Sequence, residues 1–218
     1  MQNKREILKK YLSLDLQPQL DRIKSIVLDS GAPLEGNCFY YHNTFNEFDD
    51  LILKQTNLYW CGSQGNHICE IGFNAGHSAL LLLSGQDKNK TVFFTIADIG
   101  AHPYTAPCLE YIRSEFPNVI IDYIQGDSTI EVPKKMNFLG GIYDVVHVDG
   151  GHSQHCVTTD LNSASKLVKN GGIIIVDDTN FVHISETLDS FLSENSNFVE
   201  SDVFPTLGYQ HRIIRKSI

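Results

Sequence analysis

The chain has 218 residues, of which 42% are hydrophobic and 20% are charged, and its formal net charge at pH 7 is −9. This length and composition are typical of a globular domain with a sizeable core, and they exclude a collagen-like or low-complexity chain. The acidic excess disfavours a general nucleic-acid surface, because such a surface needs clustered Lys and Arg side chains.

The five cysteines, at positions 38, 61, 69, 108 and 156, form no C-x-x-C pair and have no metal-finger spacing. An odd number without paired spacing is typical of reduced thiols in an intracellular protein. The N-terminal residues contain no apolar segment of a signal peptide, and the longest apolar runs, ALLLL and GGIIIV, are too short to cross a bilayer. We therefore expect a cytoplasmic protein without a membrane partner.

The N-terminal part is predicted to be helical. Apolar residues at helical spacing over residues 4–29 indicate one or two amphipathic helices with an interruption near Pro18. A turn-rich connector, GAPLEGN, follows. Asn43 or Thr44 is then expected to cap a helix over residues 45–60, because Asp and Glu lie in its early turns.

After Gly65 the pattern changes, and short apolar runs alternate with helical stretches. This alternation predicts an α/β fold with a mostly parallel, doubly wound sheet that helices cover on both faces. Ligands of such sheets bind beyond the carboxyl ends of the strands, so the residue that follows each apolar run is a candidate site residue. The predicted strands are residues 67–72, 92–98, 119–124, 143–149, 172–177, 198–204 and 209–215, and the predicted helices are 77–84, 104–116, 154–168 and 183–194.

A glycine turn follows the first of these strands, in the stretch ICEIGFNAGHSALLLL. Gly72 and Gly76 allow a tight turn and the close approach of a ligand, and the helix that follows directs free N–H groups toward it. An ordinary strand–helix connection also favours glycine, so that interpretation stays open. A dinucleotide site would need G-x-G-x-x-G, but Asn74 and His77 occupy the second and third glycine positions, and the Gly-Lys-Ser/Thr of a P-loop is absent.

The pattern acid-x-Gly-x-x-x-Gly-x-Ser in this turn resembles motif I of class I S-adenosylmethionine (SAM)-dependent methyltransferases. The resemblance extends over residues 65–216. The stretch KNGGIIIVDD resembles the turn before the fifth strand of that family, and YQHRIIRK resembles its closing antiparallel strand. It implies a Rossmann-like sheet of seven strands and a SAM site on the turn. The implied cofactor-binding residues of the turn are Glu70, Gly72, Phe73, Asn74, Gly76 and Ser78.

The ends of the second and third strands agree with the same resemblance. VFFTIAD ends in Asp98, where a carboxylate can accept hydrogen bonds from both ribose hydroxyls of the cofactor. The third strand ends in Gly126, Asp127 and Ser128, at the position that contacts the adenine edge in the family. The resemblance implies that these residues, together with Asp149 after the fourth strand, bind SAM.

Three carboxylates are expected to meet beyond the fourth and fifth strands, which are neighbours in this fold. Asp149 follows the fourth strand, and Asp177 and Asp178 follow the fifth. Uncompensated carboxylates repel one another, so either one of them is protonated or a cation lies between them, and Mg²⁺ or Mn²⁺ suits a set of oxygen ligands. The alternative is that Asp149 and Asp178 cap the segments that follow them.

Metal-dependent O-methyltransferases that act on macrolide sugars carry an Asp, a His three residues later and an acidic pair. Asp149, His152, Asp177 and Asp178 resemble this pattern. Catechol-type enzymes instead place a lysine near the first Asp, where this chain has His152 and His155. The resemblance therefore implies an O-methyltransferase that is assisted by a divalent metal. Its acceptor would be a sugar or another vicinal-diol small molecule, such as a glycan or a nucleotide sugar.

The expected chemistry gives the residues after the fourth strand their roles. A metal bound to two vicinal oxygens lowers the pKa of a hydroxyl group and fixes its orientation. His152 is assigned as the general base and Asp149 as its catalytic partner at the metal, with His155 as the fallback base. His77, in the glycine turn, is interpreted as a packing residue or one on the SAM side.

Residues 65–218 are expected to form the SAM-binding domain. Residues 1–64 are expected to form a helical appendage, either as a lid over the site or as the surface of a homo-oligomer. Three rival functions stay open: an RNA nucleoside O-methyltransferase, a SAM-binding module without catalysis, and a nicotinamide oxidoreductase. Salt-dependent tRNA binding would favour the first, and the incomplete G-x-G-x-x-G disfavours the last.

Overall fold

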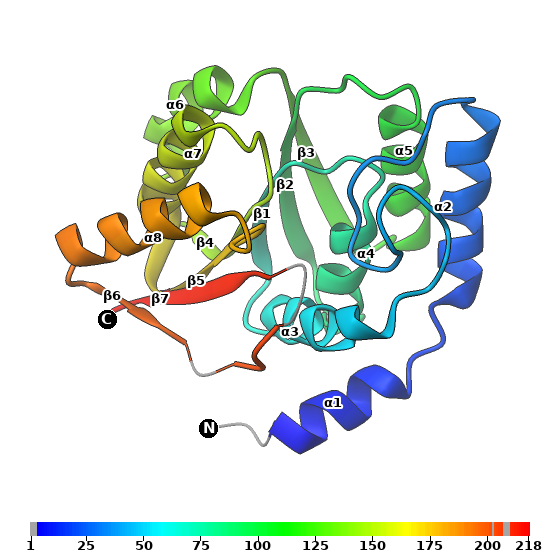
Figure 1. Cartoon of the computed structure of the whole chain (residues 1–218), viewed down its shortest axis with the longest axis horizontal. Coiled ribbons are helices and arrows are strands. Elements are labelled where there is room, and N and C mark those ends of the chain that lie inside the picture. Colours follow the sequence, from blue (N-terminus) through cyan, green and yellow to red (C-terminus); the bar gives the residue numbers. More distant parts are fainter. Residues whose placement is uncertain (1–3, 202, 207–209) are drawn as a thin grey trace.

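The computed structural model describes residues 4–201, 203–206 and 210–218. A seven-stranded sheet in the order β3-β2-β1-β4-β5-β7-β6 forms its centre (Figure 1). Strands β1 to β5 are parallel, whereas β7 is antiparallel to both β5 and β6, which confirms the predicted Rossmann-like fold. The strands are β1 (His67–Ile71), β2 (Val92–Asp98), β3 (Val119–Gln125), β4 (Tyr143–Val148), β5 (Val168–Val176), β6 (Phe198–Glu200) and β7 (Arg212–Lys216).

Helices cover both faces of the sheet. Helices α2 to α5 lie on one side and α6 to α8 on the other, while α1 packs against α3 (Figure 1). The helices are α1 (Lys4–Leu12), α2 (Gln17–Asp29), α3 (Ile52–Gly62), α4 (His77–Ser84), α5 (Thr105–Glu115), α6 (Ser128–Leu139), α7 (Gln154–Leu167) and α8 (Val182–Glu194), with a 3₁₀ turn η1 (Asp49–Leu51) before α3. Within the described residues, none of these helices is long and apolar enough to cross a membrane.

Two apolar layers hold the sheet between its helices, because successive side chains of a strand point to opposite faces. Ile68 and Val145 belong to the layer under α2 to α5, and their neighbours Cys69 and Val146 belong to the layer under α6 to α8. All of these positions are buried, so the central strands are apolar on both faces.

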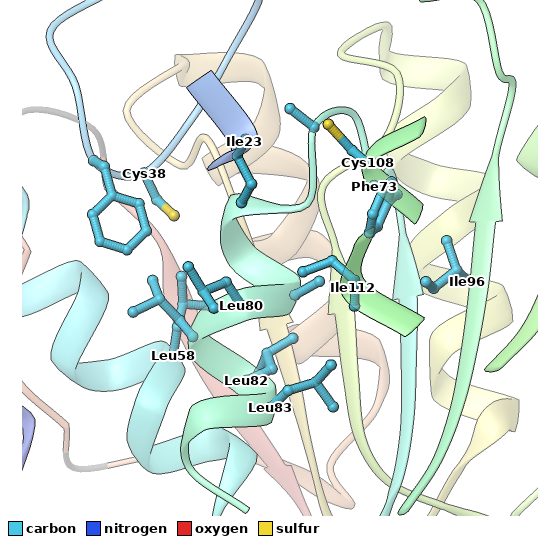
Figure 2. Close-up of a cluster of buried hydrophobic side chains, with 14 of the residues drawn as sticks. Ile23, Cys38, Leu58, Phe73, Leu80, Leu82, Leu83, Ile96, Cys108 and Ile112 are labelled. Atoms are coloured by element: carbon cyan, nitrogen blue, oxygen red, sulfur yellow. The ribbon is translucent and has the colours of Figure 1, made fainter. Parts of the chain in front are cut away.

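Helix α4 lies at the centre of the first layer. Its run of leucines is buried on every side, and Leu58 of α3 lies beside Leu80 (Figure 2). Ile23 of α2 and Cys38 join the same cluster (Figure 2). Cys38 lies in the segment 30–48 between α2 and η1, which is called the connector from here on. The N-terminal residues therefore share an apolar core with the sheet, and the boundary predicted after residue 64 stays a prediction.

Helix α6 is absent from the predicted elements, and its sequence explains why. It contains Pro133, and Val132 is its one fully buried residue, so it lacks the apolar periodicity of a core helix. Ile130 and Phe138 are exposed, the latter by 82%. Asp127, expected at a cofactor site, is the N-cap of α6, and its Oδ1 accepts a hydrogen bond from the backbone of Thr129 at 2.9 Å.

The predicted helix over residues 45–60 begins too early. Helix α3 starts at Ile52, and neither Asn43 nor Thr44 caps it. The Thr44 hydroxyl instead closes a local turn, donating to the Tyr41 carbonyl at 2.6 Å.

Smaller differences concern other element ends. Strand β5 starts at Val168 and not at 172, whereas β6 ends at Glu200 before its predicted end at 204. The predicted strand over 209–215 begins at Arg212, and residues 202 and 207–209 lie outside the described residues. The helical break near Pro18 is confirmed between α1 and α2, with Pro18 in the first turn of α2, where the missing N–H has no partner to lose.

Candidate active site

The turn between β1 and α4 requires both of its glycines. Gly72 has φ of 91°, and an added Cβ would lie 2.0 Å from the carbonyl oxygen of Asp149. Gly76 has φ of 82°, and its added Cβ would lie 2.6 Å from the ring of Phe73. A side chain at position 72 would push the turn away from the backbone that follows β4, and one at position 76 would displace the Phe73 ring.

Asn74 occupies the position at which many such turns have a glycine. Its φ of 53° is left-handed, a conformation that asparagine adopts more readily than most residues. Its side-chain amide donates hydrogen bonds to the carbonyls of Glu35 and Gly36 in the N-terminal connector, the second at 3.2 Å. Asn74 therefore provides the backbone shape of a glycine and also fastens the connector to the turn.

Asp98, at the end of β2, holds the same turn from the other side. Its Oδ2 accepts hydrogen bonds from the backbone N–H groups of Phe73 at 2.7 Å and Asn74 at 2.9 Å. Its Oδ1 accepts from Gly100 at 2.7 Å. The carboxylate expected to contact ribose thus also orders the glycine turn, because it accepts from two successive N–H groups of it.

A cavity of about 310 Å³ lies beyond the ends of β1, β2 and β3. Seven of the predicted cofactor-binding residues line it: Gly72, Asn74, Asp98, Gly126, Asp127, Ser128 and Asp149. Ser128 also donates to Asp160 Oδ2 at 3.0 Å. The structure therefore brings together the predicted residues from four different strand ends.

A larger cavity, of about 490 Å³, lies next to the first one and shares Gly72, Asn74 and Asp149 with it. Its lining includes Phe73 and Ser78, also predicted to bind the cofactor, whereas Glu70 and Gly76 line neither cavity. The other walls come from the connector, from α3 and from the residues after β2, β4 and β5. They include Glu35, Gly36, Asn37, Cys38, Tyr40, His42, Asn43, Lys54, His102, His152, Asp177, Asp178 and Phe181.

Lys54 of α3 compensates the acidic cluster and was not foreseen from the sequence. Its Nζ lies 2.6 Å from Asp177 Oδ1, and both side chains are about 95% buried. Burial opposes the charge of each group, but the ion pair raises the pKa of Lys54 and holds the pKa of Asp177 well below its usual range. The expectation that the three carboxylates are uncompensated is therefore wrong for Asp177.

His147, on β4, extends this ion pair toward the glycine turn. The His147 ring is fully buried, with Nδ1 3.0 Å from Glu70 Oε1 and Nε2 3.7 Å from Asp177 Oδ2. Burial pushes the pKa of His147 down, but the carboxylates of Asp177 and Glu70 raise it to about 10. Glu70 Oε1 also accepts from the Ser78 hydroxyl at 2.6 Å. Glu70, His147, Asp177 and Lys54 thus form a row of alternating charges, which we call the buried charge row.

Asp149 lies at the junction of the two cavities and, among the residues that the structure describes, has no ion-pair partner. Burial, together with the neighbouring Asp177, raises the pKa of Asp149 well above its usual range. The carboxyl group therefore needs a proton or a cation beside it. It does not cap α7, because the N-cap is Ser153, whose hydroxyl accepts from Cys156 N at 3.2 Å. The capping interpretation of Asp149 is wrong.

His152 and Asp178 face each other across the mouth of the larger cavity. His152 Nε2 lies 2.8 Å from Asp178 Oδ2, and this contact raises the pKa of His152 above its ordinary value. Asp178 has φ of 55°, and it does not cap α8, which begins after Phe181 without a side-chain cap. The capping interpretation of Asp178 is therefore also wrong.

The predicted metal ligands divide into two groups. Asp149 and Asp177 lie with His147, and Asp149 lies with His152 and Asp178, in each case with one ligand atom per residue within 4.8 Å of the others. In the first group His147 and Asp177 are buried, and Asp177 contacts Lys54. The second group lines the cavity and provides two carboxylates, the donors that Mg²⁺ and Mn²⁺ prefer, next to the imidazole of His152.

Comparisons with known proteins identify the family. A family model for a methyltransferase domain matches residues 69–179, just over half of the chain. The chain belongs to this methyltransferase family. No curated protein sequence matches the chain.

Two solved structures illustrate the similarity of this methyltransferase to others. The O-methyltransferase TomG from Streptomyces achromogenes, in complex with SAM, is 13% identical, with a TM-score of 0.66 over 100% of this chain and 99% of that one. The O-methyltransferase from Bacillus cereus, in complex with SAH, is 14% identical, with a TM-score of 0.63 over 99% and 96% of the two chains. At these identities the likeness shows the fold alone.

The two other histidines singled out in the methyltransferase sequence belong to neither group of candidate ligands, although His77 lines the larger cavity. His155 is exposed on α7 and lines neither cavity. His77 is buried, and its ring packs 5.9 Å from that of Phe39 and 5.7 Å from that of Tyr40. Burial lowers the pKa of His77 to about 4, which makes it a neutral packing residue near pH 7.

Two site residues of the methyltransferase, Lys54 and His147, were not predicted from the sequence. His147 lies inside an apolar strand, and Lys54 lies in a helix with other polar residues, so neither follows a strand end. One available signal was the polarity of the stretch KQTN, whose four residues are all buried in α3. A helix that buries four polar residues in a row must supply partners for them.

Proposed function

We propose that this methyltransferase transfers the methyl group of SAM to a hydroxyl group of a small polar acceptor, with a sugar or another vicinal diol as the favoured class. One observation carries the proposal. The cavity lined by the glycine turn and Asp98 adjoins the cavity that His152 and Asp178 face, and the two share Gly72 and Asp149. A donor and an acceptor bound in these cavities would meet at that junction.

The donor is proposed to lie along the glycine turn. Its ribose would be held near Asp98 and its adenine near Asp127 and Ser128, in the smaller cavity. The complexes of TomG with SAM and of the Bacillus cereus enzyme with SAH support this choice of cofactor for a chain of the same fold. The sulfonium group would then lie close to Gly72, which lines both cavities.

The reaction is a displacement at the methyl carbon. The acceptor oxygen forms a bond to that carbon while the carbon–sulfur bond breaks, and S-adenosylhomocysteine leaves. His152 takes the hydroxyl proton onto its imidazole, and Asp178, 2.8 Å away, orients the ring and stabilises the imidazolium that forms. The proposal thus assigns proton transfer to this pair and orientation to the cavity walls.

A divalent ion, Mg²⁺ or Mn²⁺, is proposed at Asp149 and Asp178 beside His152. The raised pKa of Asp149 and the three converging donor atoms fit such an ion. When bound, it would lower the pKa of the acceptor hydroxyl. Asp177 fits the ion less well, because Lys54 already lies on its Oδ1.

The cavity lining supports a polar acceptor. Besides His152 and Asp178, the larger cavity presents the polar side chains of Asn37, His42 and Asn43. Hydroxyl-rich molecules match such a surface because they offer several donors and acceptors at once. The aromatic residues Tyr40 and Phe181 lie on the same wall and can stack on a sugar ring or a flat ligand.

Two measurements test the proposal. SAM and S-adenosylhomocysteine should raise the melting temperature of the protein, whereas NAD should not. Transfer of a labelled methyl group from SAM is then measured on nucleotide sugars, free glycans, catechols and tRNA, with and without EDTA. Transfer to the sugar panel that EDTA abolishes would agree with the proposal. Transfer to tRNA alone would favour an RNA methyltransferase, and SAM binding without any transfer would favour a non-catalytic module.

A further inference from the structure

Lys54 lines the larger cavity, where the acceptor is proposed to bind. It belongs to α3, whereas the predicted site residues follow the ends of the parallel strands. We propose that its ammonium group is a built-in counter-ion for Asp177. It would keep a divalent cation away from that carboxylate and direct metal binding to Asp149 and Asp178, beside His152. Lys54 is then a positioning residue of the acceptor site. This inference rests on the proposed function only for the statement that the cavity takes an acceptor.

The oxygens of Asp177 are already engaged. Oδ1 contacts Lys54 Nζ at 2.6 Å and accepts a hydrogen bond from the backbone N–H of Asp178 at 2.7 Å. Oδ2 faces His147 Nε2 at 3.7 Å. A divalent ion at this carboxylate would therefore lie beside the ammonium group of Lys54, and the repulsion would offset much of its attraction to the carboxylate.

Lys54 is held in place by the helix around it. The neighbouring Gln55 is buried, accepts from the Tyr11 hydroxyl at 2.6 Å and donates to the Cys38 carbonyl at 2.7 Å. Asn57 donates to the Phe204 carbonyl at 2.9 Å. These bonds fix α3 against α1, the connector and the segment before β7, so Lys54 has little freedom to leave Asp177.

A buried lysine destabilises the folded protein unless its charge is paired. Lys54 and Asp177 should therefore stay in contact with each other. Asp177 is equally fixed, because its backbone N–H donates to the Val148 carbonyl at 3.0 Å. Of the three predicted metal ligands, this leaves Asp149 and Asp178 without a lysine partner in the described structure, with His152 next to them. The ammonium therefore selects which of the two groups of ligands can take an ion.

The test is a calorimetric titration of the full chain with Mn²⁺, without SAM. Lys54→Met should bind Mn²⁺ at least about 10-fold more tightly than the wild type, because Asp177 is released as an additional ligand. Lys54→Arg keeps the positive charge and should bind like the wild type. Asp178→Asn should lose binding, and the double variant K54M/D177N should lose the gain of K54M.

Folding is checked by circular dichroism, because Lys54→Met leaves Asp177 buried without its partner. If that variant does not fold, Lys54→Gln and the double variant are titrated in its place. Unchanged or weaker Mn²⁺ binding by the folded neutral variants would overturn the proposal, and so would the absence of binding in every protein. Methyl transfer is measured separately, so a failure of the proposed function leaves the metal titration interpretable.

Discussion

The donor side of the site, at the smaller cavity, and the acceptor side, at the larger cavity, are formed by different parts of the chain. On the donor side, the backbone makes the shape: two glycines, Asn74 in a left-handed conformation and a carboxylate, Asp98, that accepts from backbone N–H groups. On the acceptor side, side chains make it: the buried charge row ends at Lys54, and the pair of His152 and Asp178 faces the cavity.

This difference determines which amino-acid substitutions damage each side. A backbone turn depends on the absence of a side chain, so adding one methyl group is the most damaging substitution there. A charge network depends on pairs, so removing one partner leaves the other buried and uncompensated. The predictions below compare the two sides, from the largest expected effect to the smallest.

Gly72→Ala should be the most damaging substitution on the donor side. The added Cβ would lie 2.0 Å from the Asp149 carbonyl, at φ of 91°, and we expect a loss of about 3 kcal/mol or more in unfolding free energy. Urea denaturation measures it. Gly141→Ala is the matched control, since its φ is 71° but nothing lies within 4 Å, and it should cost only about 1 kcal/mol. Equal losses in the two variants would contradict the crowding argument.

Asp178→Ala should abolish turnover while the affinity for SAM stays close to that of the wild type. Asp178 lines the larger cavity and contacts His152, but it does not line the smaller cavity, where most of the predicted cofactor residues lie. Calorimetry with SAM and a methyl-transfer assay with and without EDTA measure the two properties. Full activity in excess EDTA would remove the metal from the mechanism, whereas weakened SAM binding would place Asp178 on the donor side.

His152→Ala should lower kcat by about 10² to 10⁴-fold, if His152 is the general base. His155→Ala, on the exposed face of α7, is the control and should change kcat less than about twofold. The reverse pattern would move the role to His155.

The pH dependence of kcat provides a second check on His152. Its raised pKa means that it stays protonated, and unable to take a proton, until the pH exceeds the ordinary 6.5. Activity should therefore fall as the pH drops through an inflection above 6.5. An inflection at or below 6.5 in the wild type would argue against the pair.

Asp98→Ala should weaken SAM binding by about 10- to 100-fold, because it removes a proposed ribose acceptor and two hydrogen bonds that order the glycine turn. Isothermal calorimetry with SAM measures the change. Thermal stability of the variant without SAM separates the two causes: an unchanged melting temperature would assign the loss to ribose. An unchanged affinity would contradict the assignment.

His77 should make the protein sensitive to mild acid. The unfolded imidazole binds a proton below pH 6.5, whereas the folded one does so only near pH 4, so stability is lost as the pH falls through this window. Between pH 8 and pH 5, the unfolding free energy of His77→Gln should fall by about 2 kcal/mol less than that of the wild type. If the unfolding free energies of the wild type and His77→Gln, measured by urea denaturation, changed equally with pH, His77 would not contribute to the pH dependence of stability.

Most of the fold was predictable because it follows from local patterns. The central strands are buried on both faces, so they appear as apolar runs, and α4, α5, α7 and α8 were predicted within about two residues of their ends. Helix α6 was not, because it buries little and contains Pro133. The start of α3 was misplaced because Thr44 has the residue type of a cap but is used in a turn.

The residues of the candidate site were also predicted only in part. The seven predicted residues of the smaller cavity do meet there, since parallel strands bring their carboxyl ends to one edge. The acidic cluster was located correctly, but its charge balance was not. Lys54 lies 123 positions before its partner Asp177. No local spacing relates the two.

The sequence by itself determined the sheet, the glycine turn and the gathering of acids, because each depends on neighbouring residues and on the regular direction of parallel strands. Only the tertiary structure decided which acid is paired and which is free to take an ion. That choice depends on how α3 packs and on the buried pairing of Asp177 with Lys54 and His147. Electrostatic energy depends on distance through the folded protein and not along the chain, so a charge network becomes visible only when the chain is folded.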